Sequence, residues 1–187
     1  MPLYQNAAAT ASKLIVGNCK LETAAYASAA GSYTWVNCGV GMVKSAGYKP
    51  TMYSVQAGNA PDPLKGVADE IFTIEADLIE FDGSVLSAMS AGLIGGVSAG
   101  TVYSIYGGGV GTLTPRAFRL TNTSMIAGAT KQTIMTVYYA TMTSGLQFTF
   151  KSDNDSDPLA VIAVTLEAEL DTTRSAGTQL YGITHTL

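Results

Sequence analysis

The sequence predicts a mainly β protein, a β-sandwich or partly closed barrel with one short helix. Two segments alternate apolar and polar residues with the period of a strand, and other short β-rich runs are separated by Gly, Pro and Ser. Strands do not alternate with long helical patterns, which argues against a parallel sheet. The 187 residues, 47% of them hydrophobic, suit a single domain over 1–187 that buries a core without disulfides.

The first alternating segment, 69–81, organises the rest of the chain. One parity is apolar and the other acidic, which predicts a strand buried on one face: the apolar positions are Phe72, Ile74, Ala76 and Leu78, and the outward ones Thr73, Glu75 and Asp77. The apolar parity then switches to Ile79 and Phe81, which predicts a bulge or twist. Ser84 is a candidate N-cap for a short helix that extends to Leu93.

A second segment repeats this pattern: 73–78 reads TIEADL and 165–170 reads TLEAEL. Its predicted apolar face consists of Ile162, Val164, Leu166, Ala168 and Leu170. The candidate site residues are the acids of these two strands: Glu75, Asp77, Glu167 and Glu169. As a general acid and base they would repel each other and would need a cleft. A repelling surface is the simpler interpretation, and two ordinary amphipathic strands with solvated outer faces remain the alternative.

The remaining elements follow from short β-rich runs. Strands are predicted at 13–21, 32–38, 101–106, 115–120, 131–143, 146–151 and 178–184. The runs 131–143 and 146–151 are expected to form a hairpin about Ser144-Gly145. A long irregular loop is predicted at about 39–67, because Gly and Pro interrupt any periodicity there, with Met52, Tyr53 and Val55 as a possible strand inside it. The expected role of this loop is contact outside the subunit.

Charge and cysteine content exclude several function classes. The net charge of −4 and only ten scattered basic residues do not favour a grip on nucleic-acid phosphates. Cys19 and Cys38 have no metal-binding spacing and are expected to be buried thiols. The first residues lack a basic start followed by an apolar run, so no signal peptide is predicted and synthesis in a cytoplasm is the default.

No charged residue occurs from Gly83 to Pro115. The run is long enough to span a membrane, and Gly92, Gly96 and Gly100 have the spacing of close-packed transmembrane helices. Its density of Gly and Ser instead favours a weakly charged surface that packs against a neighbouring subunit.

The catalytic and metal-binding motifs are formal matches only. Gly96 to Gly100 reads GVSAG, with Asp171 and His185 downstream in the order of α/β hydrolases. That motif requires a strand–turn–helix in a parallel sheet, which the β-rich order does not provide. The acidic loop 153–157 lacks the Gly and Glu of a calcium loop, and GGGVG at 107–111 lacks dinucleotide spacing. We therefore expect no catalytic residues, no cofactor and no metal site.

Three segments of the first half of the chain form an ordered series. They are Gly17-Asn18 with Lys20-Leu21, then Trp35 with Gly39, and then Thr73 to Glu80 leading into Ser84 to Leu93. This series resembles the "GN-x-KL" strand, the "W-x-x-x-G" strand and the "TIEA-L-E" strand before a small helix of the tail tube (major tail) proteins of long-tailed bacteriophages. The chain departs from the pattern in its Gly-rich run from Gly92 to Gly111.

The resemblance implies a β-sandwich flanked by a helix, with six subunits joining strands into a ring-shaped barrel. Rings would stack into a tube, and genomic DNA would pass through the lumen without specific binding. The acids named above would line that lumen and repel phosphates, and the 39–67 loop would bridge successive rings. Expected partners are further copies and other tail proteins (tape measure, tail terminator, baseplate), with no membrane, in a virion assembled in the host cytoplasm. The alternative is another capsid-associated or surface β-sandwich module that binds a protein.

Overall fold

The computed structural model describes residues 19–28, 31–55, 64–90, 94–99, 102–108, 113–123, 132–152 and 160–186. Within these ranges the protein is mainly β with one helix, as predicted. The elements are β1 (Cys19–Ala25), β2 (Val36–Asn37), β3 (Val40–Val55), β4 (Leu64–Leu78), α1 (Gly83–Met89), β5 (Ile94–Ala99), β6 (Val102–Gly107), β7 (Arg116–Thr123), β8 (Gln132–Met142), β9 (Gln147–Thr149), β10 (Val161–Ala168) and β11 (Tyr181–His185).

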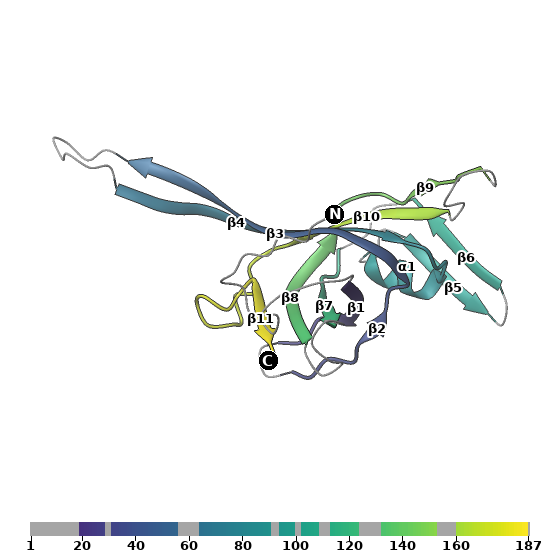
Figure 1. Ribbon diagram of the computed structural model, residues 1–187, viewed down its shortest axis with the longest axis horizontal. Coiled ribbons are helices and arrows are strands. Elements are labelled where there is room, and N and C mark those ends of the chain that lie inside the picture. Colours follow the sequence, from purple (N-terminus) through teal and green to yellow (C-terminus); the bar gives the residue numbers. More distant parts are fainter. Residues whose placement is uncertain are drawn as a thin grey trace, which may run out of the picture.

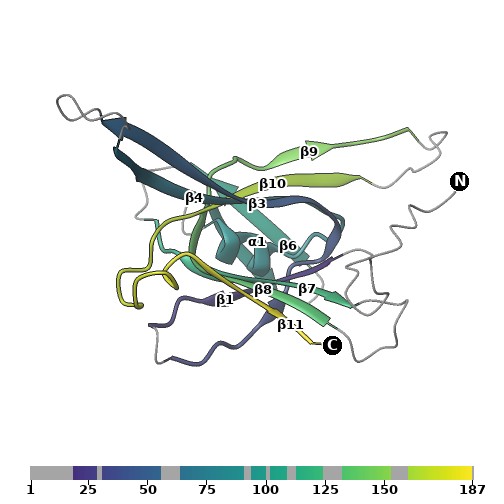
Figure 2. The same ribbon diagram turned by 60° about the vertical axis from the view of Figure 1, so that its left-hand side comes forward.

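Nine of these strands form one antiparallel sheet that is not closed. The order is β2-β1-β7-β8-β10-β4-β3, with β11 paired to β8 and β9 paired to β10. β8 pairs with β7 along most of its length but with β10 only over Ala140–Met142, opposite Leu166–Ala168. The sheet bends at this short junction into two layers, with β1, β7, β8 and β11 facing β3, β4, β9 and β10 (Figures 1 and 2).

The core lies between the two layers and against α1. Every second residue of β4 and β10 enters the core: Phe72, Ile74, Ala76 and Leu78 from β4, and Ile162, Val164, Leu166 and Ala168 from β10. These residues confirm the predicted alternation, but Leu170, predicted on the same apolar face, lies past the end of β10 and is exposed. The buried side chains of β4 and β10 form one cluster with Phe118, Val137 and Met142 of the opposite layer and with Val85, Leu86 and Met89 of α1. Burying such apolar side chains is the main favourable contribution to folding.

The end of β4 leads directly into α1, but two details differ from the prediction. The N-cap is Asp82 and not Ser84: Asp82 Oδ1 accepts from the backbone N–H groups of Ser84 at 2.8 Å and Val85 at 3.2 Å. The helix ends at Met89, short of the predicted Leu93, which itself lies outside the described residues. Carboxylates are good caps because they satisfy free N–H groups and complement the helix dipole.

The structure also shows what happens where the apolar parity switches after Leu78. Ile79 and Phe81 are exposed, and the irregularity that accompanies the switch lies on the partner strand, where the register shifts between Val40 and Met42. Gly39 just before β3 has a positive φ of 65°, and its carbonyl accepts from the N–H of Ile79 at 2.9 Å. An added Cβ there would lie 2.5 Å from the Cβ of Glu80, so this turn requires glycine.

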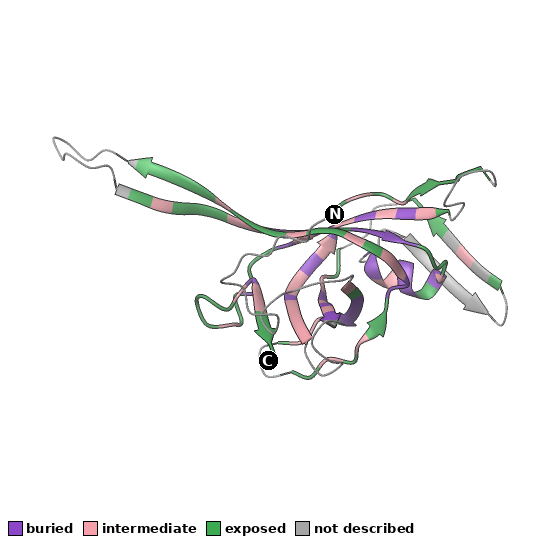
Figure 3. Cartoon of the chain, viewed as in Figure 1, coloured by how far each residue is buried: buried purple, intermediate pink, exposed green. Residues whose placement is uncertain are grey.

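The predicted loop at about 39–67 is wrong over most of its length. β3 and β4 pair continuously from Val40 opposite Leu78 to Val55 opposite Leu64, and their distal half extends from the body as a two-stranded arm (Figure 1). Residues 56–63 lie outside the described residues. Both faces of the arm are largely exposed (Figure 3), so no buried face imposes an alternation. One register shift within the arm, between Thr51 and Met52, and two nearer the body break the parity that remains. Pro50, which lacks an N–H, lies within β3, the last strand of the sheet.

The predicted hairpin about Ser144-Gly145 is also wrong. β8 and β9 do not pair with each other but follow one another along the same edge of β10. The backbone N–H of Thr143 donates to the carbonyl of Thr165 at 2.9 Å, and Ser144 Oγ accepts from the N–H of Thr165 at 2.7 Å. Ser144-Gly145 therefore connects β8 to β9 without reversing the chain direction, and both strands pair with the same edge of β10.

Other predicted elements are confirmed only in part. The strand at 32–38 reduces to the two residues of β2, and the described part of the strand at 13–21 starts at Cys19. Tyr33 and Trp35 are half-buried. Of the two cysteines expected to be buried thiols, Cys38 is buried but Cys19 is only half-buried. The uncharged run contains the β5–β6 hairpin, a separate two-stranded sheet. Within the described ranges no helix is long and apolar enough to cross a membrane.

The capping geometry yields a test of the β4–α1 junction. We expect Asp82→Ala to lower the free energy of unfolding by about 1 kcal/mol, because two N–H groups of α1 lose their acceptor. Ser84→Ala is the matched control and should cost less, since the hydroxyl of Ser84 only donates to Asp82 at 2.6 Å. Urea denaturation followed by circular dichroism measures both; a larger loss for Ser84→Ala would contradict this assignment.

Candidate functional site

The four predicted site residues come together on one face of the sheet. β4 and β10 pair antiparallel with Glu75 opposite Thr165 and Thr73 opposite Glu167, so the repeated Thr-x-Glu sequences face each other in reverse. Glu75 and Glu167 therefore each lie opposite a threonine. Two carboxylates directly opposite each other would be destabilising, and this register avoids that. The acids share the sheet face opposite to the core.

Their environments differ. Glu75 is exposed on β4, and Glu167 is half-buried on β10. Glu169 is exposed just past the end of β10, where its N–H donates to the carbonyl of Tyr139 at 2.9 Å. Asp77 is only 9% exposed, and its Oδ1 lies 2.7 Å from Lys44 Nζ, as an ion pair without a directed hydrogen bond. The charge of Asp77 is thus compensated within the subunit.

A bulge explains how Lys44 reaches Asp77. On β3, Val43 lies opposite Ala76 and Ser45 opposite Glu75, so Lys44 is the extra residue between two paired positions. Bulges re-aim a side chain in this way. The lysine was not assigned to the site from the sequence, because strand parity cannot predict an inserted residue.

The sequence analysis missed a fifth carboxylate on the same face. Asp69 has the parity of Glu75 on β4 and is exposed. A hollow of about 420 Å³ is lined by Asp69, Glu70, Glu167 and Glu169. Extending the two-residue period back from Thr73 would have found Asp69. Among the described residues, strand register and the ion pair with Asp77 place Lys49 and Lys44 of β3 on this face, so its five carboxylates outnumber these lysines.

The β3–β4 arm begins at a set of packed aromatic rings. Tyr181 of β11 packs against Tyr48 and Phe72, with ring centroids 5.6 Å and 5.0 Å away. The hydroxyl of Tyr48 donates to Glu70, which raises the pKa of Tyr48 to about 12 and keeps the phenol protonated. Towards the tip the ring of Tyr53 covers Gly66, where an added Cβ would lie 2.5 Å from it. These contacts hold the base of the arm against β11 and pack β3 against β4 near the tip.

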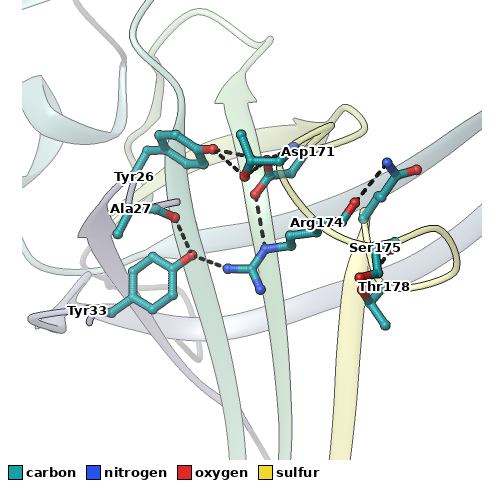
Figure 4. Close-up of polar contacts among 9 residues, drawn as sticks. Tyr26, Ala27, Tyr33, Asp171, Arg174, Ser175 and Thr178 are labelled. Atoms are coloured by element: carbon teal, nitrogen blue, oxygen red, sulfur yellow. Dashed lines mark hydrogen bonds and ion pairs between the residues drawn. The ribbon is translucent and has the colours of Figure 1, made fainter. Parts of the chain in front are cut away.

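A buried polar cluster connects the segment that follows β1 to the segment between β10 and β11 (Figure 4). Asp171 is 2% exposed; its Oδ1 accepts from Tyr26 at 2.9 Å and Thr173 Oγ1 at 2.6 Å, and its Oδ2 accepts from Arg174 Nε at 3.0 Å. Arg174 also donates to the hydroxyl of Tyr33 at 2.8 Å and stacks over Tyr138 at 3.6 Å. The cluster fixes the segment after β1 to the β10–β11 connection.

This cluster decides how the hydrolase motif is interpreted. Asp171 is engaged with Arg174 and not with His185, whose Nδ1 lies 2.8 Å from Thr133 Oγ1 on β8. Ser98 lies inside β5, opposite Tyr103 in an antiparallel hairpin, and not on a strand–turn–helix elbow. The acidic loop 153–157 lies outside the described residues. Within the described ranges, no group of three or more Asp, Glu, His or Cys residues is placed to hold a metal ion.

A scan against protein-family models finds no match, and a search of curated proteins finds no significant relative.

The Asp171 cluster predicts a specific acid sensitivity. Burial raises the pKa of Asp171, but hydrogen bonds from Thr173, Tyr26 and Arg174 outweigh it and lower the pKa below its ordinary value. The stabilisation is therefore fully present above about pH 4, the ordinary pKa of aspartate, and is lost as pH falls through the lower pKa of the folded protein. Asp171→Asn should lower the free energy of unfolding by roughly 3 kcal/mol at neutral pH, because Arg174 loses its partner.

Urea denaturation between about pH 2 and 7 measures this effect. The slope of stability against pH should become smaller in Asp171→Asn but not vanish. Glu22 also has a lowered pKa, because hydrogen bonds from Lys20 and Arg119 outweigh the effect of its burial. Tyr33→Phe is the matched control and should keep the wild-type slope. If Asp171→Asn keeps the wild-type slope, the carboxylate of Asp171 does not contribute to the loss of stability at acidic pH.

Proposed function

We propose that this protein is a structural subunit of a bacteriophage tail tube, in which copies form rings that stack around a DNA-conducting lumen. The observation that carries the proposal is the common acidic face of β4 and β10, opposite the face that forms the core. In the proposed assembly Glu75, Glu167 and Glu169 line the lumen together with Asp69, and Asp77 contributes less because Lys44 compensates it.

Electrostatics supports a conduit rather than a binding site. Duplex DNA carries one negative charge per roughly 1.7 Å of its axis, and proteins hold it by neutralising phosphates with Lys and Arg. A wall dominated by carboxylates does the opposite, because it repels the phosphates from all sides. DNA centred in such a tube has no favourable contact to break as it moves.

The unclosed sheet supports assembly. The path ends at β2 on one side and at the sixteen-residue β3 on the other, and the β3–β4 arm leaves the body with both faces exposed. Exposed strand edges favour pairing with another chain, and closure in a symmetric ring removes them. Tape measure, terminator and baseplate proteins are the further partners of this proposal.

Assembly is tested first. We expect the purified protein, concentrated alone or with a tail initiator, to form rings and then hollow tubes in negative-stain electron micrographs. Sedimentation velocity should show a monomer giving way to a ring-sized species as concentration rises. A protein that remains monomeric under all of these conditions would refute the proposal.

The lumen assignment has its own test. Glu75→Lys combined with Glu167→Lys should leave tube formation intact and make the tubes retain short duplex DNA, with a retention that falls steeply as salt is raised. The isosteric pair Glu75→Gln and Glu167→Gln is the control and should retain less DNA than the lysine pair. If the lysine pair retains no more DNA than the wild type, these residues do not face the lumen.

One observation favours a second candidate, a β-sandwich module that binds another protein. The uncharged β5–β6 hairpin forms its own small sheet and exposes Val102 and Tyr106. This function predicts a complex of fixed stoichiometry with a different protein and no self-stacking. The micrographs described above therefore separate the two candidates.

A further inference from the structure

A cavity of about 270 Å³ lies where the base of the β3–β4 arm meets the connection between β10 and β11. This connection passes below the base of the arm (Figure 1). The arm contributes Tyr48 from β3 and Glu70 from β4. The rest of the lining comes from the β10–β11 connection and the start of β11: Leu170, Gly177, Gln179, Leu180 and Tyr181. We call this space the tyrosine cavity.

Two aromatic rings line the tyrosine cavity at an angle to each other. The ring planes of Tyr48 and Tyr181 are inclined by 49°, with centroids 5.6 Å apart. Phe72, a buried core residue, packs against Tyr181 with a centroid distance of 5.0 Å and so fixes that ring to the core. The face of an aromatic ring attracts a cation, and more strongly where water is partly excluded. A ligand in the cavity can contact both tyrosine rings.

Glu70 is the one charged residue among the described residues that line the cavity. Its Oε1 accepts from the hydroxyl of Tyr48. Within the described part of the chain, its Oε2 accepts no hydrogen bond, and no lysine or arginine forms an ion pair with this carboxylate. The negative charge of Glu70 is therefore uncompensated there, unlike that of Asp77, which Lys44 neutralises.

The polar groups of the cavity distinguish between classes of ligand. An anion would meet Glu70 without any described lysine or arginine in the lining to offset it. The hydroxyl of Tyr48 is already engaged with Glu70, and Nε2 of Gln179 donates to the carbonyl of Arg174 at 3.1 Å. A neutral polyol would leave the carboxylate without a cation. A primary ammonium supplies both a positive charge and three N–H donors, and charge-assisted hydrogen bonds of this kind are the strong ones.

We propose that the tyrosine cavity binds a primary alkylammonium group, with the nitrogen on Oε2 of Glu70 and the methylene groups against the rings of Tyr48 and Tyr181. A small free amine and the side chain of a lysine on another protein share this chemistry. The site is built within one subunit and does not depend on assembly into rings. Its occupant contacts both the arm and the β10–β11 connection, so binding should hold the base of the arm more firmly.

Ligand specificity of the full-length wild-type protein is the first test. Titration with butylammonium, followed by saturation-transfer difference NMR, should show saturable binding. 1-Butanol has the same number of non-hydrogen atoms but no charge and should not saturate. Tetramethylammonium keeps the charge but has no N–H donor, so its dissociation constant should be severalfold higher. Equal binding of butylammonium and 1-butanol would overturn the proposal, and equal binding of the two cations would overturn the hydrogen bond to Glu70.

A matched pair of carboxylate variants places the site. Glu70→Gln keeps the shape and an acceptor for Tyr48, and it should raise the dissociation constant of butylammonium roughly tenfold or more. Asp69→Asn is the control, because Asp69 lines the neighbouring acidic hollow and not this cavity, and it should bind like the wild type. If both variants lose affinity equally, the amine responds to the overall negative charge of the protein and the proposal fails.

The aromatic part of the site is tested at Tyr181. Tyr181→Phe keeps the ring and should retain binding, whereas Tyr181→Leu should weaken it severalfold. Circular dichroism checks that each variant folds, and the wild-type ligand series decides the question even if Tyr181→Leu does not. Equal affinities of the two variants would remove the aromatic contact from the proposal.

A competition experiment identifies the source of the ammonium group. Lysine blocked at its backbone amine and carboxyl groups should displace butylammonium if the cavity accepts a lysine side chain of another protein. If the blocked lysine does not compete while butylammonium still binds, the ligand is a small free amine. Failure of both amines to bind saturably would overturn the site itself.

Discussion

The antiparallel pairing of β4 with β10 is the constraint on which the rest of the structure depends. Its register places Phe72 opposite Ala168 and Leu78 opposite Ile162, so every residue of one parity enters the core. A slip by one residue would exchange the two faces, bury the carboxylates and expose the apolar set. Two similar hexapeptides thus define the inside and the outside of the subunit together. The position of α1 follows as well, because only four residues separate the end of β4 from the start of the helix.

The sequence could predict those parts of the fold in which one face of a strand is buried. β4 and β10 alternate because one parity of each packs against the opposite layer, and the acidic residues on the other parity were found for the same reason. The arm was missed because neither of its faces is buried, so no selection for alternation acts on it. Register shifts in β3 removed the parity that remained, and the same shifts hid Lys44.

Other features were beyond a local pattern. The Asp171 cluster joins residues more than 140 positions apart, such as Tyr26 with Asp171, and nothing near either residue signals the contact. Asp82 and Ser84 are both good capping residues, so the choice between them depended on where β4 ends. Ser144-Gly145 has the composition of a hairpin turn, yet β10 offers one long edge that both flanking strands use. In each case the local sequence allowed more than one structure, and a contact with a distant part of the chain determined which one formed.

The outer edge of β3 restricts which strands can pair with it. Long flat edges recruit any exposed strand, but this one is interrupted by two bulged residues, Gly41 and Lys44, by Pro50 and by lysines, all of which obstruct unspecific pairing. A strand that adds to this edge has to match an irregular spacing of backbone donors and acceptors. The backbone of β3 itself therefore discriminates between matching and mismatched strands, in addition to whatever its side chains contribute.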